Sequence, residues 1–228
     1  MEDEEKNQQE FDFNSSMTDL MTSLMVIFVL LLVVLFNNIG EKGQKIRDKM
    51  VDDLTNQNSQ AVVNNSLKDL KITKSENDPL SFIVNIDEQS GLKFESNKSD
   101  IMPQSKQKLK EMYIELLDYI CKPENKQNID SIQIIGYTDS QPVKADPKFG
   151  NLSLSQDRAL SVLKYGLYVV GLGTEKGTCL QELASINGRG MAEQKPTFAE
   201  SRRVEFKIRL KSYEQEKHIG LFNGSRKK

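Results

Sequence analysis

The chain has 228 residues, with 31 Lys or Arg against 33 Asp or Glu and a formal net charge of -2. This length allows one domain of ordinary size plus additional segments, and the balanced charge argues against a nucleic-acid-binding chain. One histidine and two cysteines cannot form the ligand clusters of a structural zinc site, so we expect no metal, no other cofactor and no nucleic-acid partner.

The first predicted element is an apolar helix over residues 15–38. From Leu20 to Phe36 only Thr22 and Ser23 are not strongly apolar. The run is about 20 residues long, or roughly 30 Å of helix, which is enough to cross the hydrocarbon core of a bilayer. Since no other segment has this character, the sequence predicts a protein that crosses the membrane once.

A cleaved signal peptide is the alternative interpretation of this apolar segment. Signal peptides begin with basic residues and end in a cleavage site of small residues. Here residues 1–14 are acidic and polar, and the apolar run ends in Leu-Phe-Asn-Asn. We therefore expect an uncleaved anchor preceded by an acidic tail that is too short to fold.

The orientation of this anchor is not obvious from its flanks. Lys6 is the only basic residue before the helix, whereas Lys42, Lys45, Arg47 and Lys49 follow it. The positive-inside rule alone would place the C-terminal part in the cytoplasm, although a long domain can translocate regardless of such charges.

Asp19 stands at the start of the apolar run. By position alone it could be a first-turn acid that the helix dipole favours at the membrane interface. The alternative is a carboxylate that carries ions, since charged groups within membranes mark ion pathways. The hydroxyls of Thr22 and Ser23 could line such an ion path, or simply help helices to pack.

Residues 39–78 form a predicted connector. Ile46, Met50 and Leu54 recur every four residues, which indicates a helical stripe. Further apolar residues continue the stripe: Val62, Val63, Leu67 and Leu70. The connector is either a solvated helical spacer that touches its copy in a dimer or a plug that covers an ion path.

Residues 79–212 are predicted to fold into an α/β sandwich, with two helices over one face of a mixed sheet, which makes the fold class α+β. Alternation and periodicity predict the order β-α-β-α-β-β. The expected elements are strands at 80–88, 129–139, 183–190 and 202–211 and helices at 103–121 and 153–173. Ser153 or Ser155 would cap the second helix, a Gly-rich stretch would end it, and residues 213–228 would form a C-terminal tail.

The C-terminal region resembles OmpA-like peptidoglycan-binding domains. The resemblance covers roughly Ser81 to Leu210 and is carried in order by LKFESNKSDIMPQSKQKL, IQIIGYTDSQP, NLSLSQDRALSVLKY, INGRGMAEQKP and SRRVEFKI. It implies a ligand with carboxylates and an amine, the diaminopimelate of the peptide stem. The family pattern differs at Ser201, where many members have Asn, and in the long loop after Asp139.

The resemblance assigns ligand roles to residues that suit a zwitterion. Asp139 would pair with the amine, and Arg158 would hold a carboxylate through two hydrogen bonds. Without the resemblance, Asp139 would be interpreted as a turn residue and Arg158 as a surface helix residue. Other motif positions would shape the pocket: Thr138, Asn151, Leu154 and Arg203.

The membrane helix resembles that of MotB-type stator subunits, in which an aspartate precedes a similar Leu-Met-Thr-x-Leu-Met sequence. Here residues 19–25 read DLMTSLM. The resemblance implies a self-dimer inside a pentamer of MotA-type partners and an ion-carrying role for Asp19, with protons or sodium as the ion. It also implies a C-terminal domain in the periplasm and an N-terminus in the cytoplasm, against the basic flank.

Within this superfamily the acidic N-terminal tail and the apolar run look more like ZorB subunits of Zorya antiphage systems than like flagellar MotB. The partner would then be a ZorA-like pentamer. A flagellar stator subunit, or a passive single-pass wall tether without transport, remains the alternative. The sequence has no P-loop and no Ser-His-Asp arrangement, so we expect no enzyme activity.

Cys121 ends the first predicted helix and Cys179 follows the second. In this fold the two helix ends can lie on the same side, and an oxidising periplasm permits a disulfide. The sequence leaves open an intrachain bridge, free thiols and intermolecular pairing.

Overall fold

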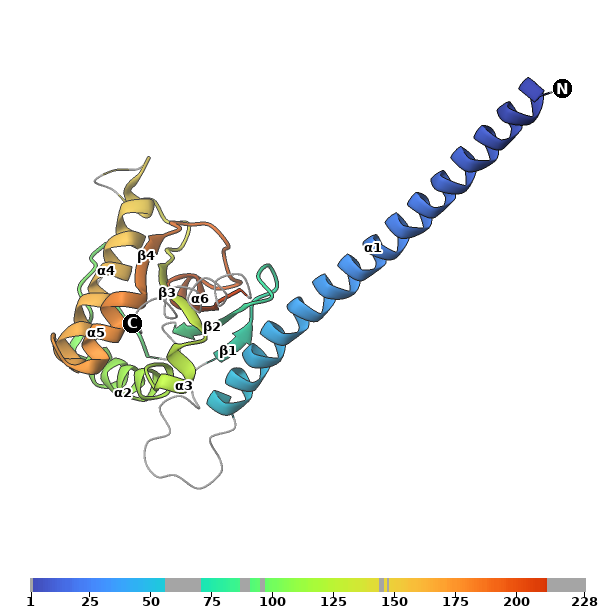
Figure 1. Ribbon diagram of the computed structural model, residues 1–228. Coiled ribbons are helices and arrows are strands. Elements are labelled where there is room, and N and C mark those ends of the chain that lie inside the picture. Colours follow the sequence, from blue (N-terminus) through green and yellow to red (C-terminus); the bar gives the residue numbers. More distant parts are fainter. Residues whose placement is uncertain are drawn as a thin grey trace. The chain divides into compact units, whose positions relative to one another are not determined.

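The computed structural model describes residues 2–55, 71–86, 91–94, 97–143, 146 and 148–212. Two units are distinguished, residues 1–42 and 43–228. The elements are α1 Glu2–Thr55, β1 Lys71–Lys74, β2 Ser81–Ile86, α2 Pro103–Ile120, α3 Pro123–Lys126, β3 Ile129–Gly136, α4 Gly150–Val170, α5 Glu175–Leu183, β4 Ala184–Gly188, α6 Phe198–Ser201 and β5 Val204–Leu210 (Figure 1).

The first unit contains the predicted apolar helix as part of α1. Among the described residues, Met17–Leu35 is the one helical segment long and apolar enough to cross a membrane. Its large apolar side chains, from Met17 to Leu35, are between 46% and 69% exposed, apart from Leu32, which is half-buried. An apolar surface of this size requires lipid or another protein around it.

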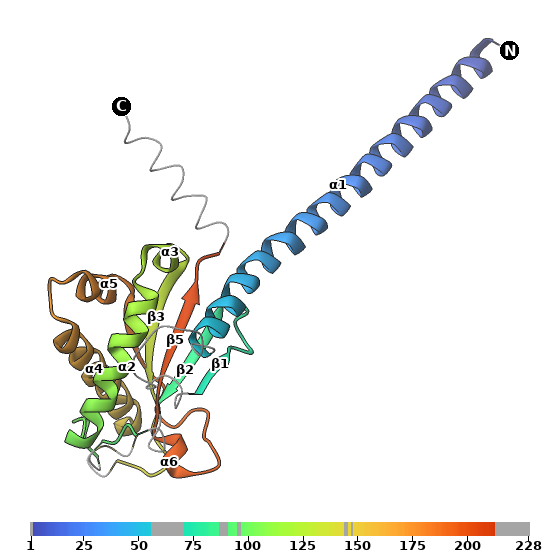
Figure 2. The same cartoon turned by 90° about the horizontal axis from the view of Figure 1, so that it is seen from below.

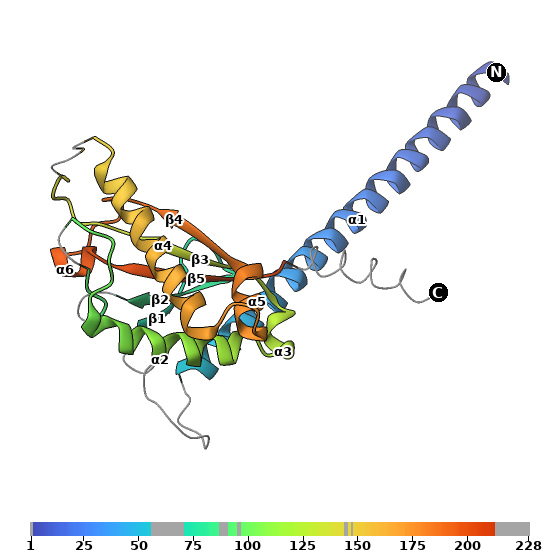
Figure 3. The ribbon, with the colours of Figure 1, turned by 90° about the vertical axis from the view of Figure 1, so that its left-hand side faces the viewer.

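The second unit is built on a five-stranded sheet in the order β1-β2-β5-β3-β4. The pairs β1/β2, β2/β5 and β3/β5 are antiparallel, and β3/β4 is parallel. The helices α2, α4 and α5 lie together on one face of this sheet (Figures 2 and 3). The predicted two-layer α+β architecture is confirmed.

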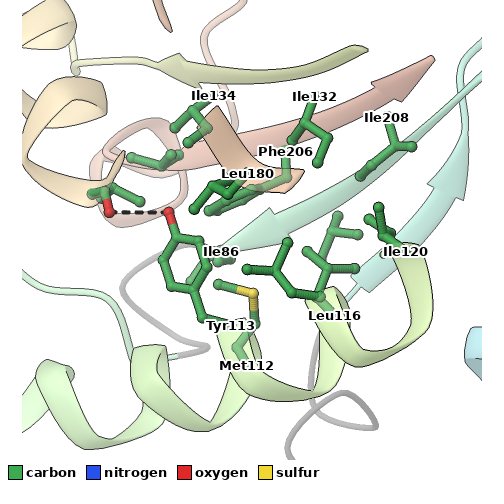
Figure 4. Close-up of a cluster of buried hydrophobic side chains, with 14 of the residues drawn as sticks. Ile86, Met112, Tyr113, Leu116, Ile120, Ile132, Ile134, Leu180, Phe206 and Ile208 are labelled. Atoms are coloured by element: carbon green, nitrogen blue, oxygen red, sulfur yellow. Dashed lines mark hydrogen bonds between the residues drawn. The ribbon is translucent and has the colours of Figure 1, made fainter. Parts of the chain in front are cut away.

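Alternating residues of the central strands form the core beneath these helices. On β5, Phe206 and Ile208 are buried on the helix side of the sheet, whereas Arg209, which follows Ile208, is exposed. Figure 4 shows the α2 side chains that meet these strands, among them Met112, Tyr113 and Leu116. The Tyr113 hydroxyl donates a 3.0 Å hydrogen bond to the Val162 carbonyl, which ties α2 to α4.

The six predicted elements of the domain are all present, but the expected cap of the second helix is wrong. α4 begins at Gly150 with Phe149 as its N-cap, so Ser153 and Ser155 both lie inside the helix. The Gly-rich end is confirmed, since Gly171 follows the helix with a φ of 85°. Four elements were not predicted, because they are short or border longer elements: β1, α3, α5 and α6.

The structure corrects the interpretation of the connector as a solvated spacer. α1 continues to Thr55, and Met50 and Leu54 are only 3% and 2% exposed within the core of the second unit. The Tyr119 hydroxyl of α2 donates a 2.9 Å hydrogen bond to Asp53, and β1 adds an edge strand to the sheet. The other apolar positions of the predicted stripe, at 62, 63, 67 and 70, and the tail at 213–228 lie outside the described residues.

Candidate functional site

The motif residues of the domain gather at one end of the sheet. β3 ends at Gly136 and leads to Thr138 and Asp139, and its parallel neighbour β4 ends nearby at Gly188. β5 is antiparallel to β3 and therefore begins at the same end, directly after Arg203. This arrangement brings residues from widely separated parts of the sequence to one edge.

The first half of α4 approaches this edge closely. A Cβ on Gly136 would overlap the backbone carbonyl of Ser155, so only glycine allows the helix to lie so near β3. The Ser155 hydroxyl donates to the Leu152 carbonyl at 2.7 Å and accepts from the Gly190 amide at 2.8 Å. These contacts fix the start of α4 against the loops that follow β3 and β4.

Asp139 lies at this end of the sheet, and its side chain is 10% exposed. Its Oδ1 accepts a 3.0 Å hydrogen bond from the backbone amide of Gln141, and its Oδ2 accepts a 2.7 Å hydrogen bond from the Arg202 guanidinium. The Asn151 side-chain amide donates to the backbone carbonyl of Gln141 at 3.0 Å. Asp139 and Asn151 are thus joined through one loop residue.

Arg158 has different neighbours. It is 4% exposed, its Nε donates to the Lys98 carbonyl at 3.1 Å, and its guanidinium lies 5.0 Å from the centre of the Phe94 ring. These contacts connect α4 to the segment that precedes α2. Arg158 is therefore a buried arginine rather than the surface residue that its isolated position would suggest.

Thr138 is held by its backbone, whose amide donates to the Gly190 carbonyl at 2.8 Å and whose carbonyl accepts from the Gln194 side chain at 3.0 Å. Its Oγ1 is buried and has no hydrogen-bond partner among the described protein atoms. Leu154 is half-buried in α4. A buried hydroxyl without a partner is uncommon and is one of the features by which ligand or water positions are found.

Arg203 is 1% exposed and lies inside the domain. Its Nε donates to Glu205 at 2.7 Å, and its guanidinium covers the Tyr137 ring at 3.7 Å from the ring centre. Burial, together with the negative charges of Glu205 and Glu193, raises the pKa of Tyr137 well above its usual value. Arg203 thus stabilises this end of the sheet through buried contacts with Glu205 and Tyr137.

Sequence reasoning missed Arg202, the side chain that contacts Asp139. The two residues are 63 positions apart, and two adjacent arginines give no indication of which one contacts Asp139. Register offers the only clue, since residues that precede β5 and follow β3 meet at the same edge.

In the apolar segment of α1, Asp19 is exposed and shares one face with Thr22, Ser23 and Val26. The Thr22 hydroxyl donates to the carbonyls of Thr18 and Asp19, at 2.9 and 3.0 Å, and the Ser23 hydroxyl donates to the Leu20 carbonyl at 3.0 Å. Both hydroxyl protons are therefore used within the helix, which leaves the hydroxyl oxygens as acceptors.

Cys121 and Cys179 are joined by a disulfide with a Cα–Cα distance of 6.1 Å. The bridge connects the end of α2 to α5, and both cysteines are buried. Within the described ranges, no three His, Cys, Asp or Glu side chains are grouped to hold a metal ion.

Comparison with known families identifies the domain. The OmpA family matches residues 93–208, just over half of the chain. The chain belongs to the OmpA family. The match begins before α2 and ends within β5, so it includes the residues gathered at the end of the sheet, from Thr138 to Arg203.

Solved structures share the fold of this domain. The structure of a MotB-like protein from Desulfovibrio vulgaris has 17% sequence identity to this chain and a TM-score of 0.51. The match covers 78% of this chain and 99% of the D. vulgaris chain. The periplasmic domain of Helicobacter pylori MotB is 13% identical, with a TM-score of 0.49, covering 69% and 89% of the two chains. The cell wall anchor of the Pseudomonas aeruginosa T6SS is 18% identical, with a TM-score of 0.42, covering 63% and 90%.

Identities this low establish the likeness of the fold alone. The curated proteins with which the sequence was compared gave no match.

Proposed function

We propose that this protein is the peptidoglycan-anchored subunit of an ion-driven motor of the MotA/MotB type in the bacterial inner membrane. The observation that carries the proposal is the combination, in one chain, of an apolar helix bearing Asp19 and an OmpA-family domain with the fold of a MotB-like protein. Two copies of the chain act with a ZorA-like membrane pentamer in antiphage defence.

Asp19 carries the ion in this proposal. A charged carboxylate costs roughly 2.5–3.5 kcal/mol at the centre of a membrane helix and less near its end, so it is retained where a wet or protein-lined path receives it. Desolvation favours the protonated carboxyl group and access to water favours the ionised one. Alternating access to two compartments would therefore move one proton per cycle, with Thr22 and Ser23 lining the path; sodium is the other candidate ion.

Energy for the motor comes from the membrane potential. One charge that crosses 100 mV releases about 2.3 kcal/mol, which is enough to drive a mechanical step when many ions pass in sequence. A wall anchor is needed for that step to produce torque, because an unanchored subunit would turn with its partner. The OmpA-family domain supplies the anchor.

The anchor binds the zwitterionic end of the peptide stem. Asp139 pairs with the ammonium group and Arg158 with a carboxylate, while Thr138, Asn151, Leu154 and Arg203 shape the pocket. The largely buried carboxylate of Asp139 at the end of the sheet, with its pairing to the partly exposed Arg202, and the buried Thr138 Oγ1 without a partner among the described residues support this location. The buried guanidinium of Arg158 also contacts the Lys98 carbonyl and the Phe94 ring.

The disulfide supports a periplasmic position for the domain. Buried intrachain disulfides persist in oxidising compartments and are rare in the cytosol. This argument outweighs the basic residues after the membrane helix. The N-terminal tail is then cytoplasmic and the chain crosses the inner membrane once.

A second candidate is a flagellar stator subunit, which the fold of the MotB-like protein from D. vulgaris favours equally. A passive wall tether is the third. The hydrogen bonds of Thr22 and Ser23 to their own helix agree with hydroxyls that serve packing alone.

The wall site is tested by co-sedimentation of the full chain, in detergent, with purified sacculi. We expect Asp139→Ala and Arg158→Ala to reduce binding about ten-fold or more, since each removes a charge-assisted contact. Asp157→Ala, an exposed neighbour on α4, is the control and should bind normally. Unchanged binding by both site variants would refute the site assignment, and thermal unfolding of Arg158→Ala separates lost binding from lost folding.

A further inference from the structure

We propose that Arg202 is a further ligand-binding residue of the wall site, where it forms with Asp139 a two-charge unit that selects an ammonium and a carboxylate on the same carbon. The inference rests on the proposed function of the domain. It assigns the specificity of the site to Arg202, which lies in the SRRVEFKI stretch but was not among the predicted site residues.

The pair is built into the end of the sheet. Arg202 Nη1 lies 2.7 Å from Asp139 Oδ2, and the two side chains are 31% and 10% exposed. The carboxylate is therefore mostly enclosed, while the guanidinium beside it reaches solvent. The other oxygen, Asp139 Oδ1, is directed by the Gln141 amide at 3.0 Å.

Arg202 is presented from a fixed turn. It directly follows α6, and its backbone amide donates to the Phe198 carbonyl at 3.0 Å. The start of α6 is closed by reciprocal hydrogen bonds between Thr197 and Glu200. β5 begins two residues later, so the backbone of Arg202 is held on both sides and loses little freedom when a ligand binds.

Other arginines at this end of the sheet are more enclosed than Arg202 or pair with other residues. Arg203 is buried against Glu205 and Tyr137, and Arg158 is 4% exposed against Phe94 and Lys98. Arg189 is accessible, but it pairs with Glu193 at 3.0 Å rather than with Asp139. Arg202 thus combines partial exposure with direct contact to the predicted ammonium-binding carboxylate.

An adjacent carboxylate and guanidinium are complementary to an amino-acid zwitterion. A carboxylate offers about four acceptor positions and a guanidinium five N–H donors, so both can bind a ligand without leaving each other. The ligand ammonium then meets Asp139, and its carboxylate accepts hydrogen bonds from Arg202 in addition to Arg158. A ligand with an ammonium but no carboxylate gains the contact with Asp139 and is repelled by the Arg202 guanidinium. The pair therefore favours the zwitterion over a ligand that carries an ammonium alone.

The test uses the full chain in detergent and three soluble ligands. Each ligand is acetylated on the amine and amidated on the carboxylate of one end, so that only the other end is charged. The free end of diaminopimelate carries an ammonium and a carboxylate, that of lysine an ammonium alone, and that of 2-aminopimelate a carboxylate alone. Titration calorimetry gives the affinity of each ligand for the unaltered chain, for Arg202→Gln, for Arg202→Lys and for the control Arg189→Gln. Because Arg202 is partly exposed, its variants should fold, and thermal unfolding verifies this.

We expect the unaltered chain and Arg189→Gln to prefer diaminopimelate over lysine by about ten-fold. In Arg202→Gln that preference should fall to about two-fold or less, while Arg202→Lys should retain part of it. An unchanged preference in Arg202→Gln would overturn the inference, as would tighter binding of all three ligands, which would make Arg202 a competitor for Asp139. Failure of the unaltered chain to bind either sacculi or diaminopimelate would instead refute the wall-binding function itself.

Discussion

Reduction of the Cys121–Cys179 disulfide should strongly destabilise the OmpA-family domain. The bridge closes a loop in which the two cysteines are 58 residues apart. In the chain-entropy description, a cross-link of this span lowers the entropy of the unfolded chain by about 14 cal/mol/K, which is about 4 kcal/mol at 25 °C. For a unit of this size, such a loss corresponds to a decrease in melting temperature on the order of 10 °C.

Thermal unfolding of the full chain in detergent, followed by circular dichroism with and without reductant, measures this effect. The double variant Cys121→Ala/Cys179→Ala is the matched control, because its melting temperature should be low and insensitive to reductant. Mass spectrometry of protein purified under non-reducing conditions verifies the bridge. Equal melting temperatures for the oxidised and the fully reduced chain would refute the reasoning, and free thiols in the purified protein would also contradict the periplasmic location.

Three further perturbations test the packing and charges of the domain. Gly136→Ala should lower the free energy of unfolding by about 1–3 kcal/mol and weaken sacculus binding, because the alanine methyl group would overlap the Ser155 carbonyl. The control Ser185→Ala, at an exposed position, should change neither quantity. Equal stabilities of the two variants would contradict the close approach of α4 to β3. Glu205→Gln should lower the free energy of unfolding by about 3–5 kcal/mol in denaturant unfolding, because it removes the carboxylate that pairs with buried Arg203 at 2.7 Å and leaves the longer, 4.0 Å pair with Glu193. Glu182→Gln, which breaks an exposed pair with Lys126, should cost at most about 1 kcal/mol, and a similar loss in both would be inconsistent with the burial argument. Burial opposes ionisation of Asp78, but hydrogen bonds from Ser81 and Leu80 and the charge of Lys207 outweigh it and lower the pKa of Asp78. Since the pKa is lowered on folding, Asp78→Asn should be less stable than the unaltered chain at pH 7, and the difference should vanish as the pH falls below about 4; a gap that persists at pH 2 would argue against this origin.

The fold could be predicted from the sequence because its long elements have clear periodicity. α2 carries buried Leu109, Met112, Leu116 and Ile120 on one face, and the central strands alternate, so their existence and order follow from pattern alone. β1 escaped prediction because it is a four-residue edge strand whose only half-buried residue is Ile72. The helical stripe at Met50 and Leu54 was visible, but its burial depends on a tertiary partner that local sequence does not reveal.

The site was predictable only in part, for a similar reason. Motif positions led to Asp139, Thr138 and Asn151, which the structure brings to one end of the sheet. The ion pair between Asp139 and Arg202 arises from the register of β3 against β5, and the burial of Arg158 arises from its contacts with Phe94 and Lys98. Neither contact has a signature in the residues themselves, because each joins segments about 60 positions apart.

The most direct test of the proposed motor is the activity of the Asp19→Asn variant in cells that contain the partner subunit. Phage plating and swimming motility are scored in parallel with co-purification of the membrane complex, and Asp12→Asn, which removes a carboxylate from the N-terminal tail, is the control. We predict loss of phage protection with assembly intact and full activity for the control; loss of motility instead would indicate a flagellar stator. Full activity of Asp19→Asn in both assays would contradict the account and leave this protein as a wall tether.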